Sequence, residues 1–159
     1  MKKMILLICL CVISILSMSQ KITYSDLVML ANKPQIESIE HLMGKGFVSE
    51  RALSGDKTFV YKVGEEEINI TFSHFSYDAP DCITVSFSQK FDKEFKAIES
   101  YVKTHLKKTR FFRNEDKIYT PEYKFGSKYM YVYRGMTWAT KTGFRFGEFK
   151  ISNAPGNEF

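Results

Sequence analysis

The side chains best suited to chemistry gather in one short stretch, SHFSYDAPDC, which contains His74, Asp78, Asp81 and Cys82. A histidine can activate a thiol and an aspartate can orient that histidine, so His74, Asp81 and Cys82 could form a small thiol-dependent hydrolytic site. These side chains are also zinc ligands, but their spacing matches no established zinc pattern. The sequence therefore predicts no metal site and leaves a thiol hydrolase as one alternative.

The pattern around these residues favours ordinary structural roles. His74 follows Ile68, Ile70 and Phe72 at a spacing of two, so it would extend the inward side of a strand. Cys82 begins the next strand on its polar side. The chain contains no Gly-rich phosphate loop, no Gly-x-Ser-x-Gly and no His-Glu-x-x-His. We therefore predict no cofactor and favour a non-enzymatic protein.

A second candidate site is aromatic. Of the chain's 24 aromatic residues, 12 lie between Phe111 and Phe149. Tyr129, Tyr131 and Tyr133 alternate there with apolar residues, which predicts that the three tyrosines share the open side of a strand. Tyrosine is amphipathic and suits recognition of a protein or a glycan, although cross-strand tyrosines can also simply stabilise a sheet. Four further residues could extend this surface: Tyr123, Trp138, Lys128 and Lys141.

The amino terminus predicts export. Two lysines follow Met1, an apolar run extends from Met4 to Leu16, and small residues lead to Ser19, which is the order of a secretory signal peptide. The run is shorter than the about 20 apolar residues of a membrane-spanning helix. We expect residues 1–19 to be removed after Ser19, leaving a periplasmic or secreted protein without a transmembrane segment. An uncleaved anchor is the alternative.

The mature chain, residues 20–159, has the length of one compact domain. Cys82 would be its only cysteine, so packing must stabilise it without an internal disulfide. Loss of two lysines lowers the formal net charge from +5 to +3. Residues 20–90 carry 7 basic and 10 acidic side chains, whereas residues 91–159 carry 14 and 8. The modest charge and the predicted export argue against a nucleic-acid partner.

Helical patterns precede each of two strand-rich regions. Thr23 or Ser25 can cap a short first helix, and a second can begin at Pro34. The second helix would bury four apolar residues: Ile36, Ile39, Leu42 and Met43. The clearest helix has five apolar residues at steps of three or four: Phe91, Phe95, Ile98, Val102 and Leu106. Basic residues up to Arg110 would complement the dipole at the end of this helix.

Period-two patterns predict the strands. They cover residues 57–63, 68–72 and 83–87 in the first half and 118–125, 128–134 and 143–151 in the second. Gly64 and Gly126 lie at tight turns. In the last strand Phe144 and Phe149 have opposite parity, which predicts a bulge near Gly147.

The two halves are similar in sequence. The stretch YKVG at 61–64 recurs as YKFG at 123–126, and IES at 36–38 recurs at 98–100, both at an offset of 62. Nine residues are identical between 36–72 and 98–134. We therefore predict one domain made of two α-β-β-β repeats, about 23–89 and 91–152. Such a duplication predicts an α+β fold with one antiparallel sheet and helices packed on one face.

In its element order and doubled unit, the sequence resembles the tandem-repeat β-lactamase inhibitor proteins, which are small and secreted. The resemblance matches no family motif and assigns no residue roles. The segment ending in Ser-Met-Ser-Gln resembles the signal peptides of small exported proteins of Bacteroidota-type bacteria.

These patterns favour an exported, non-enzymatic module that binds a protein through the tyrosine-lined face of its second repeat. An inhibitor of a secreted enzyme and an immunity protein against a toxin both fit this description. The alternatives are a thiol hydrolase centred on His74 and Cys82 and a structural component of an envelope assembly.

Overall fold

The computed structural model describes residues 20–50, 56–73, 81–113, 119–134, 139–140, 143–153 and 155, without the side chains of 112–113, 119, 139–140 and 143–146. The predicted signal peptide lies outside these residues. In chain order the elements are α2 (Tyr24–Asn32), α3 (Gln35–Gly44), β1 (Val48–Glu50), β2 (Lys57–Val63), β3 (Glu66–Ser73), β4 (Cys82–Ser88), the 3₁₀ turn η1 (Gln89–Phe91), α4 (Asp92–His105), β5 (Lys108–Arg113), β6 (Tyr119–Phe125), β7 (Lys128–Arg134), β8 (Ala139–Thr140) and β9 (Gly143–Ser152).

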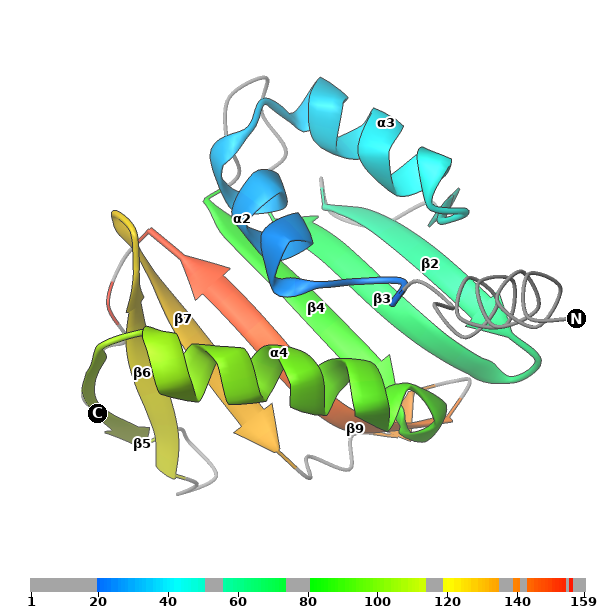
Figure 1. The fold of residues 1–159 in the computed structure, drawn as a ribbon. Coiled ribbons are helices and arrows are strands. Elements are labelled where there is room, and N and C mark those ends of the chain that lie inside the picture. The colour runs from blue at the N-terminus through cyan, green and yellow to red at the C-terminus, as the bar shows by residue number, and fades with distance from the viewer. Residues whose placement is uncertain are drawn as a thin grey trace, which may run out of the picture.

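The strands form one antiparallel sheet in the order β1-β2-β3-β4-β9-β7-β6-β5, and the short β8 pairs with β9 alone (Figure 1). Strands β4 and β9 lie side by side at the centre although they come from different halves of the chain. Every pairing between neighbouring strands is antiparallel. The prediction of an α+β fold with an antiparallel sheet is confirmed.

Alternation along each strand divides the sheet into two faces. In β3, Ile68, Ile70 and Phe72 are buried, whereas Asn69 and Thr71 between them are half-buried. The buried side continues across the neighbouring strands with the following residues: Ile83, Val85, Met130, Val132, Phe149 and Ile151. We call this side the inner face and the opposite side the outer face.

Glycines set the turns and one close contact. Gly64 and Gly126 have φ values of +68° and +59°, which L side chains rarely adopt, and they form the β2–β3 and β6–β7 turns. The pairing of β4 with β9 shifts register after Phe87, which pairs with Gly147. The predicted bulge near Gly147 is therefore confirmed.

Helix α4 packs against the inner face through Phe95, as its apolar spacing predicts. The Phe95 ring lies 4.8 Å from the Phe149 ring and 5.8 Å from the Phe87 ring, measured between centroids. Gly147 lies directly beneath it, because a Cβ atom there would be only 2.5 Å from Phe95 Cε2. The missing side chain at Gly147 lets α4 approach the centre of the sheet.

Helix α3 turns a different side to the core than its apolar pattern predicts. Leu42 is buried, but Ile36 and Met43 are 63% and 60% exposed. Gln35 and Ser38 are buried instead, and no hydrogen-bond partner is present for their side chains. Residues 35, 38 and 42 share one side of a helix, so the buried Leu42 brings these polar residues inward with it.

Two short edge strands were not predicted. Helix α4 ends at His105, so Lys108 and Arg110 lie in β5 and do not extend the helix as expected. Strand β1 forms the other edge and pairs with β2 over three residues. Each half therefore contributes at least four strands to the sheet.

Candidate functional site

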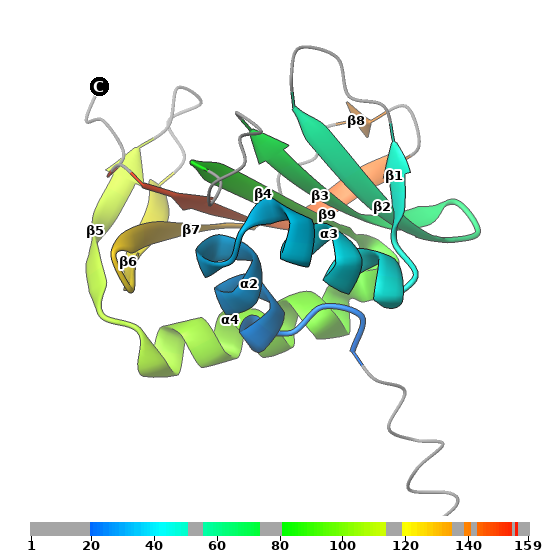
Figure 2. The same cartoon turned by 90° about the horizontal axis from the view of Figure 1, so that it is seen from above.

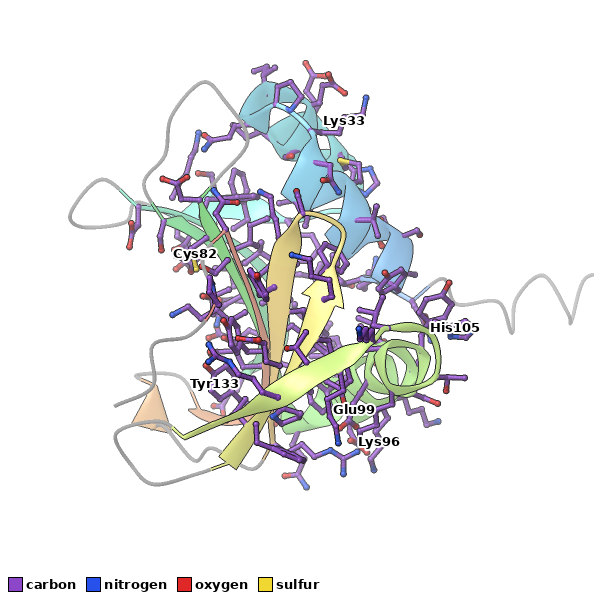
Figure 3. The ribbon with its side chains drawn as sticks, turned by 90° about the vertical axis from the view of Figure 1, so that its left-hand side faces the viewer. Lys33, Cys82, Lys96, Glu99, His105 and Tyr133 are labelled. Carbon is purple, nitrogen blue, oxygen red and sulfur yellow. The ribbon has the colours of Figure 1, made fainter. Side chains whose placement is uncertain are left out.

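Three rows of side chains cross the outer face over the central strands. Each row contains one of the predicted tyrosines and continues through β9, β4 and β3. The rows are Tyr129–Ser152–Cys82–Ser73, Tyr131–Lys150–Thr84–Thr71 and Tyr133–Glu148–Ser86–Asn69. Figure 3 shows Tyr133 and Cys82 on the side of the sheet away from Glu99 and His105 of α4. The outer face is therefore polar and aromatic.

Tyr129 and Tyr133 are the accessible tyrosines of these rows. Both are half-buried, and Lys124 Nζ lies 4.1 Å from the centroid of the Tyr129 ring. Burial, followed by the nearby Glu148 carboxylate, raises the pKa of Tyr133 to about 12. Its hydroxyl is therefore neutral at physiological pH and can both donate and accept a hydrogen bond.

Tyr131 differs from the expectation because it is only 3% exposed. Its hydroxyl donates to Glu122 Oε2 over 2.9 Å. Glu122 is itself buried, and its Oε1 accepts from the Thr109 hydroxyl over 2.5 Å. Tyr131 thus connects β7 to β6 and β5 through a buried carboxylate, and it does not line an open surface.

Lys128 and Tyr123 do not extend the surface as expected, and Tyr123 is only 4% exposed in the core. Lys128 has the strand parity of Met130 and Val132 and is only 8% exposed. Burial lowers the pKa of Lys128 below its ordinary value, and the nearby Asp81 and Cys82 oppose this shift without cancelling it. The expectation that Lys128 lies on an exposed patch is wrong, because its side chain follows the inner parity. Trp138 and Lys141 lie outside the described residues.

Of the residues of the thiol alternative, the structure describes Asp81 and Cys82. Cys82 is a free, half-buried thiol on the outer face, and burial raises its pKa although Lys150 and Thr84 oppose the shift. A cysteine nucleophile needs a lowered pKa. Asp81 accepts hydrogen bonds from the backbone and side-chain amides of Asn153, which fixes the end of β9. His74 and Asp78 lie outside the described residues.

A buried carboxylate that the sequence did not single out connects α2 to α3. Asp26 is 5% exposed, and its side chain accepts from the backbone and hydroxyl of the N-cap residue Thr23. Its two oxygens also lie 2.7 Å from His41 Nε2 and from Lys45 Nζ. Burial alone would raise the pKa of Asp26, but these hydrogen bonds outweigh it and lower the pKa. Thr23 is close to Asp26 in the sequence and forms a capping box with it. His41 and Lys45 are distant in the sequence, and the fold brings them to Asp26.

A second buried carboxylate connects α4 to β7. Glu99 is 2% exposed and forms a two-point ion pair with Arg134, while Lys103 Nζ lies 2.9 Å away. Burial raises the pKa of Glu99, but Arg134 and Lys103 outweigh it and lower the pKa. Both carboxylates are fully engaged with neighbouring side chains, which suits positioning of helices. Within the described ranges, no three potential metal ligands lie together.

The outer face around Tyr129 and Tyr133 is therefore the candidate functional site.

None of the helices in the described part of the chain has the length and apolar character needed to cross a membrane. Comparison of the chain with family models, with curated proteins and with solved structures gives no match.

Proposed function

We propose that this protein is an exported, non-enzymatic module that binds another protein through the outer face of β7, β9 and β4. Tyr129 and Tyr133 are the central contacts, and Tyr131 supports them from beneath the surface. An inhibitor of a secreted enzyme or an immunity protein would use such a surface. The observation that carries the proposal is the pair of half-buried tyrosines beside charged side chains on the central strands.

The composition of this surface supports protein recognition. Tyrosine gives a large amphipathic contact area at low entropic cost, and it is enriched among the residues that dominate binding energy. Lys124 lies over Tyr129, and Glu148 and Lys150 are paired with tyrosines across the strands. Charges of both signs around aromatic residues favour a partner with complementary charges.

The proposal includes a sheet whose helices cover only the inner face. Figure 2 supports it, because α2, α3 and α4 lie below the sheet in this view. The burial pattern supports it too, since the inner residues of β3 and β4 belong to the same core cluster as Leu27, Leu42 and Phe95. Among the described residues no helix covers the outer face, and Tyr129 and Tyr133 remain half-exposed on it, whereas Tyr131 and Ser86 are buried.

We also propose that the fold arose by duplication. The bounds of β2, 57–63, become those of β6, 119–125, when shifted by 62 residues, and β3 begins at 66 where β7 begins at 128. Gly64 and Gly126, the two turn glycines, are related by the same shift. The strand order β1-β2-β3-β4 followed by β9-β7-β6-β5 places equivalent strands symmetrically about the centre. Each repeat then comprises a helical segment followed by four main strands.

Affinity capture tests the binding function. The wild-type protein and the double variant Tyr129→Ala/Tyr133→Ala would be used as baits with an extract of the native organism. The proposal expects a protein that is captured by the wild type, lost with the double variant and retained with Phe111→Ala. Phe111 is a suitable control because it is a 56% exposed aromatic residue on the edge strand β5. A protein captured equally by all three baits contradicts the proposed surface.

Export has a separate test. The proposal expects the mature protein to begin at Gln20, directly after the predicted cleavage site. Intact-mass measurement of the protein from the native organism decides this, and a chain that retains residues 1–19 contradicts the proposed processing.

A further inference from the structure

A pocket lies between the start of α2 and the middle of α4, away from the outer face. Its volume is about 340 Å³, near the lower end of the range for small-molecule sites. All of its lining side chains are uncharged: Gln20, Thr23, Tyr24, Ser25, Ala97, Ile98 and Tyr101. The sequence did not indicate this pocket, because its two walls lie more than 70 residues apart in the chain.

The aromatic wall of the pocket is held in place on both sides. The Tyr24 and Tyr101 rings lie 4.3 Å apart, and the His105 ring stacks on Tyr101 at 4.0 Å with an interplanar angle of 15°. Tyr24 also meets Phe125 of the core edge to face at 5.8 Å. Tyr101 is nevertheless 43% exposed. Because Tyr24 and His105 cover the two faces of the Tyr101 ring, a ligand meets the edge and hydroxyl of Tyr101. This side chain is already ordered, which reduces the entropy lost on binding.

The chemistry of the lining indicates the class of ligand. Phenol, hydroxyl and amide groups of Tyr24, Tyr101, Ser25 and Gln20 supply neutral hydrogen-bond donors and acceptors. Ala97, which is exposed, adds an apolar contact. The lining side chains offer a charged ligand no ion pair in return for its lost hydration, which disfavours it. After the proposed cleavage the α-amino group of Gln20 adds a hydrogen-bond donor, which a neutral hydroxyl group can accept. A sugar ring has hydroxyl groups at its edge and apolar C–H groups on its faces, so it complements both kinds of wall.

We propose that this pocket binds the neutral sugar unit of a glycan, with Tyr101 and Tyr24 as the principal contacts. The site is distinct from the outer face, so it can fail or succeed independently of the proposed protein-binding function. A short apolar peptide is the competing occupant.

Ligand titration followed by NMR tests the proposal. The purified protein would be titrated with four neutral probes: cellotriose, maltotriose, xylotriose and N,N′,N″-triacetylchitotriose. The proposal expects at least one probe to shift the amide signals of residues 20–25 and 97–101. Tyr101→Ala should weaken its binding by about tenfold or more, while Tyr129→Ala on the outer face should leave it unchanged.

Two further measurements make the result decisive. Tyr101→Phe removes only the hydroxyl, keeps the stacked ring and should weaken binding less than Tyr101→Ala does. Melting curves of the variants show whether they remain folded. Absence of shifts with all four probes overturns the proposal, as does equal binding by the wild type and a folded Tyr101→Ala variant. Binding of a proline-rich peptide without binding of any sugar also overturns it.

Discussion

Ser86 of β4 donates a 2.9 Å hydrogen bond to Glu148 of β9, and the two residues are 62 positions apart. They are direct cross-strand partners at the centre of the sheet. Because the proposed repeats have the same offset, Ser86 and Glu148 are equivalent positions that face each other where the halves meet. The Phe87 and Phe149 rings, also equivalent, lie 5.9 Å apart on the inner face.

Removing the hydroxyl at this junction should destabilise the protein. Ser86 is 3% exposed, and a hydrogen bond to a charged group contributes about 1.5–3 kcal/mol. We expect Ser86→Ala to lower the free energy of unfolding by about 1–3 kcal/mol in urea denaturation. Ser49→Ala, at an exposed position of β1, is the matched control and should have little effect. Equal unfolding midpoints for the two variants would show that this hydrogen bond contributes nothing.

Replacing Gly147 or Gly44 by alanine should have different effects on stability. A Cβ atom at Gly147 would lie 2.5 Å from Phe95, so Gly147→Ala should destabilise the protein by about 1–3 kcal/mol through overpacking. A Cβ atom at Gly44, at the end of α3, meets nothing within 4 Å. Gly44→Ala should therefore be neutral or stabilise the protein by up to about 1 kcal/mol. Thermal melting checks both, and a Gly147→Ala variant as stable as the wild type contradicts the packing of α4.

Replacing one buried polar residue should stabilise the protein. Gln35 is 2% exposed, and neither of its side-chain polar atoms has a hydrogen-bond partner. An unsatisfied buried polar group costs about 1–3 kcal/mol. We expect Gln35→Leu to raise the free energy of unfolding, whereas Glu40→Leu on the exposed side of α3 should not. A lower unfolding midpoint for Gln35→Leu would contradict the orientation of this helix.

Stability should fall in acid partly through Glu99. Its pKa is lower in the folded state than its ordinary value of 4.5, so folding favours the ionised carboxylate. The stabilisation is therefore complete above the unfolded pKa and is lost as the pH falls through the folded pKa. Unfolding free energies of the wild type and Glu99→Gln should differ more at about pH 7 than at about pH 2. A difference that does not depend on pH would contradict an ionised Glu99.

Strong periodicity explains which elements could be predicted from the sequence. The apolar residues of α4 recur at steps of three or four, and β6 and β7 alternate around a glycine turn. Neighbouring residues therefore specify both element type and orientation. The bulge near Gly147 was also predictable, because the parity of the apolar residues changes within one strand. These signals are local in sequence.

Burial of individual side chains depends on contacts that are distant in sequence. Tyr131 alternates to the outer side as predicted, but it is buried and bonded to Glu122 of β6, which in turn accepts from Thr109 of β5. The orientation of α3 depends on how Leu42 packs, which outweighs the apolar pattern of Ile36 and Met43. The short edge strands β1 and β5 carry too few alternating residues to be predicted. The Asp26 cluster likewise joins residues that only the fold brings together.

The central claim is that Tyr129 and Tyr133 on the outer face bind a protein. The most direct test is the dissociation constant of the captured protein for the wild type and for Tyr129→Ala/Tyr133→Ala, measured by calorimetry with melting curves as the folding control. The proposal predicts a double variant that is still folded at the temperature of the binding experiment and binding weakened by about tenfold or more, equivalent to about 1.4 kcal/mol. Equal dissociation constants for the two folded proteins would contradict it.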